Sequence, residues 1–268
     1  MQDGFIATRH GRIHYLTEGE GKPLFCLHSN GCSAHNFDPV MTDLARTRRV
    51  IAWDMPGHGD SDPLTRHYTV NDYADAVVGL MDALGIARAD FIGLATGGVI
   101  AVALGANHAN RVESLVIVDA PARTAEENER EWPRLEQNFG VPTQTLEQLA
   151  ARFRAPDADF QSRWNIDRNK AGTRTMIDVM WALRDYDALS AASRITAPAL
   201  VVFGARGPNA GKASRFRQAM PQAQQDIMND CGHYPSIDDP AGFVALVNPF
   251  LDRATGAKSG EPIAKPAT

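Results

Sequence analysis

Short apolar runs alternate with longer amphipathic stretches along most of this chain. The runs have the length of buried strands and are bounded by Gly, Pro, Asn and Asp, which are typical of turns. Eight strands are predicted in this way, at residues 5–8, 12–17, 24–28, 50–53, 91–94, 115–118, 198–204 and 225–228. Strands that alternate with helices in this manner indicate an α/β fold with a mostly parallel sheet flanked by helices.

The clearest helical pattern covers residues 70–84. Apolar side chains recur there at helical spacing, and Gly85 follows as a typical helix exit. Weaker patterns predict further helices at residues 40–45, 97–107 and 240–251. We expect these helices to pack on the two faces of the sheet.

The pattern changes between Pro121 and Ile195. Charges become dense, no strand-like run interrupts the helical spacings, and three of the four tryptophans occur there. We therefore predict a helical cap at residues 121–195, inserted into a core formed by residues 1–120 and 196–254. Residues 255–268 hold almost nothing to bury and are predicted to form a flexible tail.

Composition narrows the possible partners of this 268-residue chain. The formal net charge is -5 and no run of Lys or Arg is longer than Arg48-Arg49, so we expect no nucleic-acid partner. The three cysteines are an odd number in a chain too long to need disulfides, which indicates a reducing compartment. Without a leader or an apolar run of spanning length, we predict a cytoplasmic protein with no membrane contact. A monomer and a homodimer both remain open.

Five local motifs lie at or near the ends of the predicted strands, where ligands bind in open parallel sheets. They are His28-Ser29-Asn30-Gly31, residues 54–61, the turn at residues 93–98, Asp119, and Cys231-Gly232-His233-Tyr234-Pro235. In their order and context they resemble the motifs of the α/β-hydrolase family over nearly the whole chain. The resemblance implies an eight-stranded, mostly parallel sheet with a helical cap, and a small-molecule substrate.

The turn at residues 93–98 matches the nucleophile elbow of that family with one exception. Ala95 stands where the resemblance calls for the catalytic serine, and a methyl group cannot attack a carbonyl carbon. The oxyanion hole does not depend on that serine. The resemblance assigns it to the backbone N–H of Thr96 and a second donor from the Ser29-Asn30 loop.

Two further residues match catalytic positions of the family. His233 occupies the position of the catalytic histidine, whose imidazole can accept a proton near neutral pH. The acid that orients this histidine normally follows the seventh strand, where this chain has Gly204-Ala205-Arg206-Gly207. Some members take the acid from the end of the sixth strand, which is Asp119 here. A catalytic Asp119 and a merely loop-capping Asp119 are equally compatible with the sequence.

The cap is expected to select the substrate because it covers the strand ends. Trp164, Met180 and Trp181 are candidate wall residues, although helical spacing also allows them to be the core of the cap. Cys32 and His35 are candidate polar contacts. No cluster of His, Cys, Asp or Glu has metal-site spacing, and no dinucleotide motif is present, so neither a metal nor another cofactor is implied.

Three interpretations of Ala95 remain open. We favour an enzyme that acts on a small ester, amide, lactone or related carbonyl compound, with His233 as general base and the oxyanion hole stabilising charge. Aminoacrylate-hydrolase-like members, which this chain resembles, also have alanine at the elbow. The resemblance to cofactor-free dioxygenases of heteroaromatic rings is partial, because those keep the serine. The other two interpretations are a serine hydrolase inactivated by an engineered Ser-to-Ala change, and a non-catalytic binder of small molecules.

Overall fold

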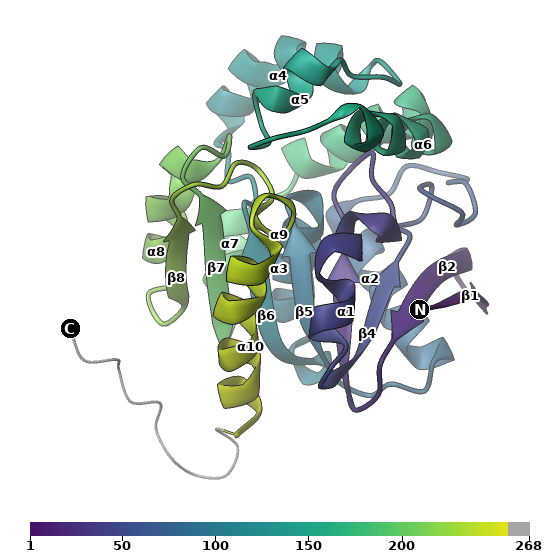
Figure 1. Cartoon of the computed structure of the whole chain (residues 1–268), viewed down its shortest axis with the longest axis vertical. Coiled ribbons are helices and arrows are strands. Elements are labelled where there is room, and N and C mark those ends of the chain that lie inside the picture. Colours follow the sequence, from purple (N-terminus) through teal and green to yellow (C-terminus); the bar gives the residue numbers. More distant parts are fainter. Residues whose placement is uncertain (257–268) are drawn as a thin grey trace.

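A single eight-stranded sheet forms the centre of the computed structural model, which describes residues 1–256 (Figure 1). The strand order is β1-β2-β4-β3-β5-β6-β7-β8. The strands are β1 (Gln2–Thr8), β2 (Gly11–Glu18), β3 (Lys22–Leu27), β4 (Arg48–Trp53), β5 (Ala89–Leu94), β6 (Val112–Val118), β7 (Ala199–Gly204) and β8 (Gln224–Met228). The predicted fold class is thereby confirmed.

Only the β1–β2 and β2–β4 pairs are antiparallel, and the other five pairs are parallel. The parallel register places Cys26 opposite Ile92 and Leu94 opposite Val118. The carboxyl ends of β3, β5, β6 and β7 therefore meet at one edge of the sheet. The motifs that follow these strands are brought to the same place.

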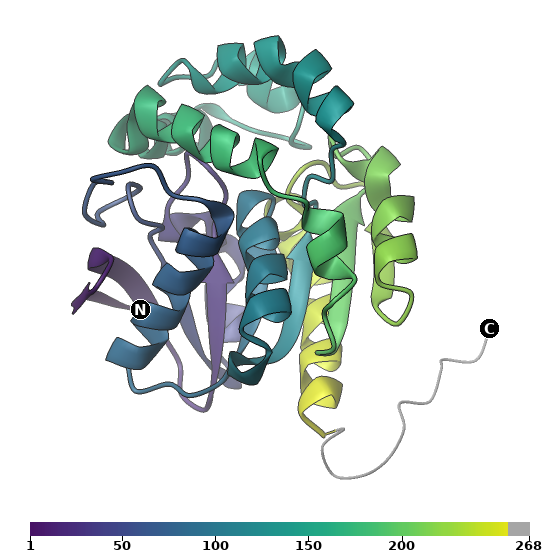
Figure 2. The same cartoon turned by 180° about the vertical axis from the view of Figure 1, so that it is seen from behind.

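Helices cover both faces of the sheet (Figures 1 and 2). One face carries α1 (Asp38–Leu44), α9 (Pro235–Asp238) and α10 (Pro240–Gly256), and the other carries α2 (Val70–Ala83), α3 (Thr96–Asn107), α7 (Ala188–Ala192) and α8 (Ala213–Ala219). Successive residues of β3 point to opposite faces, as a strand requires. Phe25 packs into the core beneath α2 and α3, whereas Cys26 packs into the core beneath α1 and α10.

Three helices lie above the carboxyl ends of the strands (Figures 1 and 2). They are α4 (Ala125–Phe139), α5 (Leu146–Ala150) and α6 (Ala158–Arg184), and the segment 121–195, described throughout, contains no strand. The short α7 at its end packs on α3 and α8 instead. The division of the chain into core and cap at residues 121 and 195 stays a prediction.

Polar contacts hold α6 to loops of the core. Lys170 Nζ donates to both carboxylate oxygens of Asp60 at 2.8 Å, and Ser33 Oγ donates to Asp167 at 2.9 Å. Gly172 has a positive φ of 74° and interrupts the helical dihedrals within α6. Glycine adopts this conformation readily, so the two halves of α6 can follow the surface below at different angles.

The observed elements are longer than predicted at several ends. Strand β6 begins three residues earlier than the apolar run, and α10 continues past Leu251 to Gly256. The apolar pattern marks only residues that face a core, while backbone hydrogen bonds continue into half-buried positions. Helix α8 has no counterpart among the predicted elements. The predicted flexible tail lies outside the described residues from position 257 onward, and residues 255–256 belong to α10.

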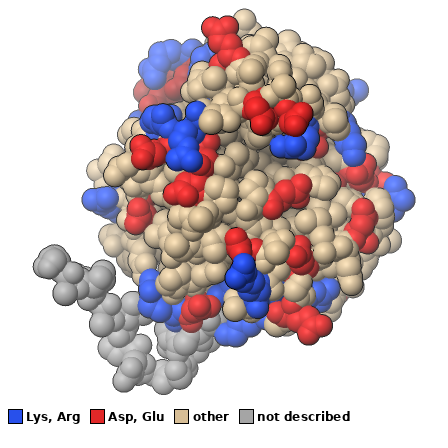
Figure 3. All heavy atoms as spheres, in the orientation of Figure 1, with Lys and Arg blue, Asp and Glu red and all other residues tan. Residues whose placement is uncertain are grey.

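Acidic and basic side chains are interspersed on the face drawn in Figure 3. Among the described residues, no helix has both the length and the apolar character needed to cross a membrane. The expectations about nucleic acid and oligomeric state stay predictions.

Candidate functional site

The turn between β5 and α3 is held in a strained conformation. Ala95 has φ 47° and ψ -102°, a combination that L-residues rarely adopt. A Cβ atom at Gly93 would lie 2.2 Å from the carbonyl oxygen of Gly97, and one at Gly97 would lie 2.0 Å from that of Leu27. Both positions therefore require glycine. The turn keeps the shape of a nucleophile elbow although its central side chain is only a methyl group.

His233 and Asp119 are brought together by the ends of β6 and β8. The Nδ1 atom of His233 forms a hydrogen bond with Oδ2 of Asp119, across 114 residues of sequence. Asp119 is fully buried and His233 is 8% exposed. Asp119 also has a positive φ of 43°, and the amide of Asn209 donates to its main-chain oxygen at 2.9 Å. The carboxylate is therefore fixed in position and can orient the imidazole.

Gly207 lies close to the acid that follows β6. A Cβ atom at Gly207 would lie 3.0 Å from Oδ1 of Asp119, a distance that leaves no room for a longer side chain. Asp119 thus occupies the space beside the loop after β7, where the family resemblance places the acid. Asp119 is the carboxylate that forms a hydrogen bond with His233.

The loop that carries His233 is also held from the cap side. The backbone N–H of His233 donates to the carbonyl oxygen of Arg152 at 2.7 Å, and the His233 ring stacks on that of Tyr234 with centroids 4.2 Å apart. A Cβ atom at Gly232 would lie 2.0 Å from the same carbonyl oxygen. The position of the imidazole therefore depends on both the core and the segment after α5.

The loop after β3 approaches the elbow from the other side. Ser29, Asn30 and Thr96 are all buried. The side-chain amide of Asn30 donates to the main-chain oxygen of Met176 at 2.8 Å, and its oxygen lies 3.1 Å from Nε2 of His58. These bonds tie the Asn30 side chain to α6 and to the loop after β4.

A cavity of about 640 Å³ opens between the loop after β3 and α6. Cys32, His35 and Trp164 line it, together with Arg163 and Asp167, whereas Ala95 and His233 do not. Burial raises the pKa of the Cys32 thiol well above its ordinary value. Cys32 is therefore a poor nucleophile at neutral pH and contributes only to the wall of the cavity.

Two candidate wall residues lie elsewhere. Met180 is buried and does not line this cavity. Trp181 is 41% exposed and its ring lies 4.2 Å from that of Trp132, with the Arg184 guanidinium over both rings. The placement of Trp181 in the substrate wall is thus corrected, because helical spacing cannot tell the inner face of a cap helix from its outer face.

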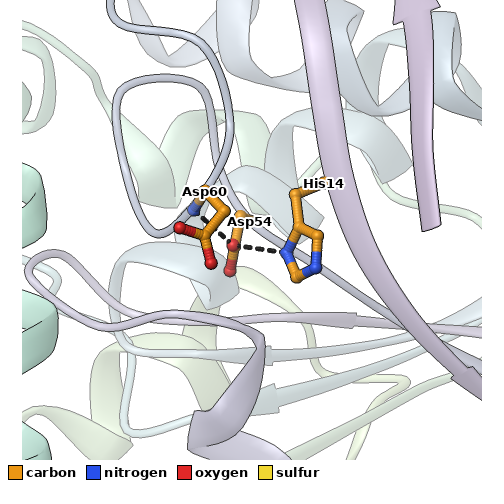
Figure 4. Close-up of side chains that lie close together, drawn as sticks. All are labelled: His14, Asp54 and Asp60. Carbon is orange, nitrogen blue, oxygen red and sulfur yellow. Dashed lines mark hydrogen bonds and ion pairs between the residues drawn. The ribbon is translucent and has the colours of Figure 1, made fainter. Parts of the chain in front are cut away.

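The tertiary structure also gathers a cluster that the sequence spacing did not indicate. One ligand-type atom each from His14, Asp54 and Asp60 lies within 4.8 Å of the others (Figure 4). Oδ2 of Asp54 accepts hydrogen bonds from His14 Nδ1 at 2.6 Å and from the backbone N–H of Asp60 at 2.8 Å. Its Oδ1 accepts from the backbone N–H of Ala34 at 2.6 Å. These bonds use the oxygens of Asp54 to hold loops together, which identifies a structural cluster.

The sequence model of the Alpha/beta hydrolase family matches residues 24–246, which include the elbow, Asp119 and His233. The chain belongs to this family. Within it, the chain is 28% identical over 267 residues to a pimeloyl-[acyl-carrier protein] methyl ester esterase of Neisseria meningitidis serogroup A, covering 91% of this chain and 81% of that one. It is 29% identical over 266 residues to a 2-hydroxymuconate semialdehyde hydrolase of Pseudomonas sp. strain CF600, covering 92% of each.

Solved structures of other proteins have the same architecture. The enol-lactonase from Burkholderia xenovorans is 26% identical and superposes with a TM-score of 0.76, covering 93% of this chain and all of that one. A membrane phospholipase A gives a TM-score of 0.83 at 24% identity, covering 95% of this chain and 86% of that one. This alpha/beta hydrolase is therefore related to hydrolases that differ widely in what they act on.

Sequence reasoning missed three residues near the site. Asn209 holds Asp119, and Arg152 and Arg168 lie in the cap close to the oxyanion loop. Their signals in the sequence are weak, since arginine and asparagine are ordinary surface residues of helices and loops. Only burial distinguishes them.

Proposed function

We propose that this alpha/beta hydrolase cleaves a small carbonyl compound without a covalent intermediate. Its relatives include hydrolases of esters and of a semialdehyde, as their names state. The observation that carries the proposal is the buried hydrogen bond between His233 and Asp119, retained beside an elbow that holds alanine. A histidine oriented by a carboxylate can activate water directly when no hydroxyl side chain is present.

In the proposed reaction, the Nδ1–H group of His233 donates a hydrogen bond to Asp119, which leaves Nε2 free to accept a proton. Nε2 takes a proton from water as the water oxygen bonds to the substrate carbonyl carbon. The carbonyl oxygen becomes an oxyanion, which the backbone N–H of Thr96 and a second N–H from the Ser29-Asn30 loop stabilise. When the tetrahedral intermediate collapses, the bond to the leaving group breaks and His233 returns the proton to that group.

The elbow contributes through its position at the start of α3. The amino terminus of a helix carries partial positive charge, which favours negative charge on a nearby oxygen. In this proposal the strained turn therefore serves charge stabilisation alone.

Replacing His233 with Ala tests the proposal. Turnover of p-nitrophenyl acetate and of small lactones should fall by roughly 10²- to 10⁴-fold, which is the usual contribution of a general base. The control is His108→Ala, because His108 also pairs with a carboxylate, Asp75 at 2.8 Å, but lies at the end of α3 remote from the elbow. Unchanged turnover in the folded His233→Ala protein would overturn the proposal.

Ala95→Ser separates the water route from a serine hydrolase that has lost its nucleophile. If water attacks directly, the wild-type protein turns over substrate. A fluorophosphonate then labels neither the wild type nor Ala95→Ser at the rate typical of serine hydrolases. A wild-type protein without turnover, together with rapid labelling and strong ester turnover in Ala95→Ser, would contradict the water route.

A further inference from the structure

The cavity of about 640 Å³ has walls of its own, apart from the elbow. It lies where the start of α6 and the segment between α5 and α6 face η1 (Ala34–Phe37), α1 and α9 (Figure 1). Neither Ala95 nor His233 lines it. Its volume is in the range of pockets that bind small molecules. The chemistry of its walls therefore indicates a ligand independently of the reaction at the elbow.

Aromatic side chains form one wall of the cavity. Phe153 and Trp164 are buried, Phe160 is half-buried, and the three ring centroids lie 5.0, 5.3 and 5.7 Å from one another. The faces of such rings carry negative charge density, which attracts a cation placed over them. This wall therefore suits a ligand with an apolar body and a positively charged end.

Acids outnumber bases among the polar residues of the cavity. Four aspartates and two arginines line it, and both arginines are exposed, where water screens their charge. Three of the aspartates already have partners. Asp38 pairs with a histidine, Asp157 caps the start of α6, and Asp238 accepts from two backbone N–H groups. The fourth, Asp167, differs from them.

Asp167 is half-buried, and the protein uses only one of its oxygens. Oδ2 accepts from Ser33 at 2.9 Å, whereas Oδ1 has no hydrogen-bond partner within the described part of the chain. No cationic side chain of residues 1–256 forms an ion pair with it. Lys170, three residues later on α6, pairs with Asp60 instead. Arg163, four residues earlier, stands in the less favourable order for a pair within a helix.

The Asp167 carboxylate is ionised at neutral pH although its surroundings disfavour the charge. Burial raises its pKa to about 6, and a hydrogen bond opposes the shift. The charges that act on it most strongly are those of Asp54, which raises the pKa, and of His35 and Lys170, which lower it. A cation bound beside Asp167 would stabilise the ionised form.

A second unused acceptor lines the same cavity. Asn36 is 7% exposed, and its Oδ1 is buried without a hydrogen-bond partner among the described residues. Leaving a polar atom unbonded away from water costs free energy, so a ligand that supplies a donor offsets this cost. Asn36 belongs to η1 and Asp167 to α6, so core and cap each contribute one acceptor. An ammonium group, with three N–H donors, matches such walls.

We propose that this cavity binds an organic primary ammonium ion with an aromatic body. The ammonium group forms a charge-assisted hydrogen bond with Oδ1 of Asp167, and the body of the ligand packs on Phe160 and Trp164. The site is separate from the elbow, and the inference does not rest on the reaction proposed there. Its ligand is held by a carboxylate and by rings, not by the amide hydrogens of the oxyanion hole.

The experiment compares phenethylammonium and tryptammonium with 2-phenylethanol and tryptophol, which are uncharged counterparts of similar shape. Isothermal titration and the shift in Tm are recorded at pH 8 and constant ionic strength, where Asp167 is ionised and both amines are protonated. We expect the ammonium ions to bind and to raise the Tm, because a ligand of the native state stabilises it. Alcohols that bind as tightly as the amines, or amines without saturable binding at millimolar concentration, would overturn the proposal.

Variants of α6 locate the site. Asp167→Asn keeps the shape of the side chain and removes its charge, so it should weaken binding of tryptammonium by roughly tenfold or more. Asp159→Asn is the control, because Asp159 is exposed at the start of α6 and does not line the cavity. It should bind like the wild type. Wild-type affinity in Asp167→Asn would contradict the proposal.

A change in the aromatic wall provides a second measurement. Phe160→Leu keeps the wall apolar and removes one aromatic face, so tryptammonium should lose roughly two- to fivefold more affinity than tryptophol. Phe160 is half-buried, which makes the substitution tolerable for the fold. An equal loss for amine and alcohol would show that the ring does not contact the charge.

His233→Ala distinguishes this site from the elbow. Under the proposed function the variant loses turnover, and it should still bind tryptammonium with the affinity of the wild type, because His233 does not line the cavity. Loss of ammonium binding in a folded His233→Ala protein would place the ligand at the elbow and overturn the separate site. Ammonium binding that depends on Asp167, with turnover that does not depend on His233, would overturn the water route alone.

Discussion

The loops around Asp54 and the cap layer around Arg168 are both buried and charged, yet their hydrogen bonding differs. Asp54 accepts hydrogen bonds on both oxygens, from His14, Ala34 and Asp60 (Figure 4). Arg168 has two buried nitrogens without an acceptor. A complete set of bonds identifies a structural cluster, because nothing is left for a ligand to supply. Around Arg168, by contrast, the described residues leave two N–H groups without an acceptor.

The largest effect on stability is expected from Asp54→Asn. This change removes the charge that faces His14 and weakens the bonds to two loops, so the free energy of unfolding should fall by about 4 kcal/mol. Urea unfolding at pH 7 measures it. Asp62→Asn is the control, because Asp62 is half-exposed and also accepts from a backbone N–H, that of Arg12; a loss below about 1 kcal/mol is expected there.

The loss of unfolding free energy in Asp54→Asn should also depend on pH. Burial alone would raise the pKa of Asp54, but the hydrogen bond from His14, the charge of His28 and the backbone N–H groups of Asp60 and Ala34 outweigh it and lower the pKa below its ordinary value. A carboxyl with a depressed pKa stabilises the fold above its unfolded pKa and loses this contribution as the pH falls through the folded value. The difference between wild type and Asp54→Asn should therefore narrow below pH 4. A constant difference would contradict the structural role assigned to this carboxylate.

Asp167→Asn should raise the free energy of unfolding at neutral pH, by less than Asp54→Asn lowers it. Burial raises the pKa of Asp167 to about 6, although the hydrogen bond from Ser33 opposes the shift. The folded state thus favours the neutral form, so wild-type stability is fully present below pH 3.8 and falls as the pH rises through 6. At pH 8 the variant should be more stable than the wild type by about 2 kcal/mol.

A comparison of the wild type with Asp167→Asn at pH 4 completes this test. Their free energies of unfolding should agree there, because Asp167 is then neutral as well. Asp159→Asn provides the control at the exposed start of α6 and should show no change in stability between pH 4 and 8 beyond about 0.5 kcal/mol. Equal stability of wild type and Asp167→Asn at pH 8 would show that solvent reaches this carboxylate.

The smallest effect is expected from Arg168→Met. The change removes two hydrogen bonds to the carbonyls of Asn138 and Val141, but it also removes a buried charge without a counterion. These terms oppose each other, and the free energy of unfolding should change by less than about 1 kcal/mol. Thermal unfolding measures it. A loss as large as that of Asp54→Asn would show that Arg168 is structural, and the contrast between the two regions would disappear.

The elbow shows how far a local motif can be interpreted without a structure. Gly93 and Gly97 predict a tight turn because any Cβ atom there would collide with backbone, and the structure contains these close approaches. The alanine at position 95 by itself predicts that the elbow cannot form a covalent intermediate with the substrate. Neither inference needs contacts between distant residues, which is why both are accessible from the sequence.

The acid partner of His233 illustrates the opposite case. The sequence could not choose between a catalytic and a capping Asp119, because 114 residues separate Asp119 from His233. The decision came from the register of β6, β7 and β8, which places the loops after β6 and β8 on either side of β7, and from the hydrogen bond that this allows between Asp119 and His233. The distance between two side chains so far apart in the sequence depends on how the strands pair.

The sequence by itself determined the alternation of strands and helices, the α/β-hydrolase fold and the absence of a serine at the elbow. These properties follow from hydrophobic periodicity and from the steric demands of glycine, which act over a few neighbouring residues. Only the tertiary structure decided that Trp181 lies on the outside of the cap, that His14 joins Asp54, and that Arg168 is buried without an acid. Burial and charge compensation are properties of residues far apart in the chain, so they are set only when the helices of the cap close over the sheet.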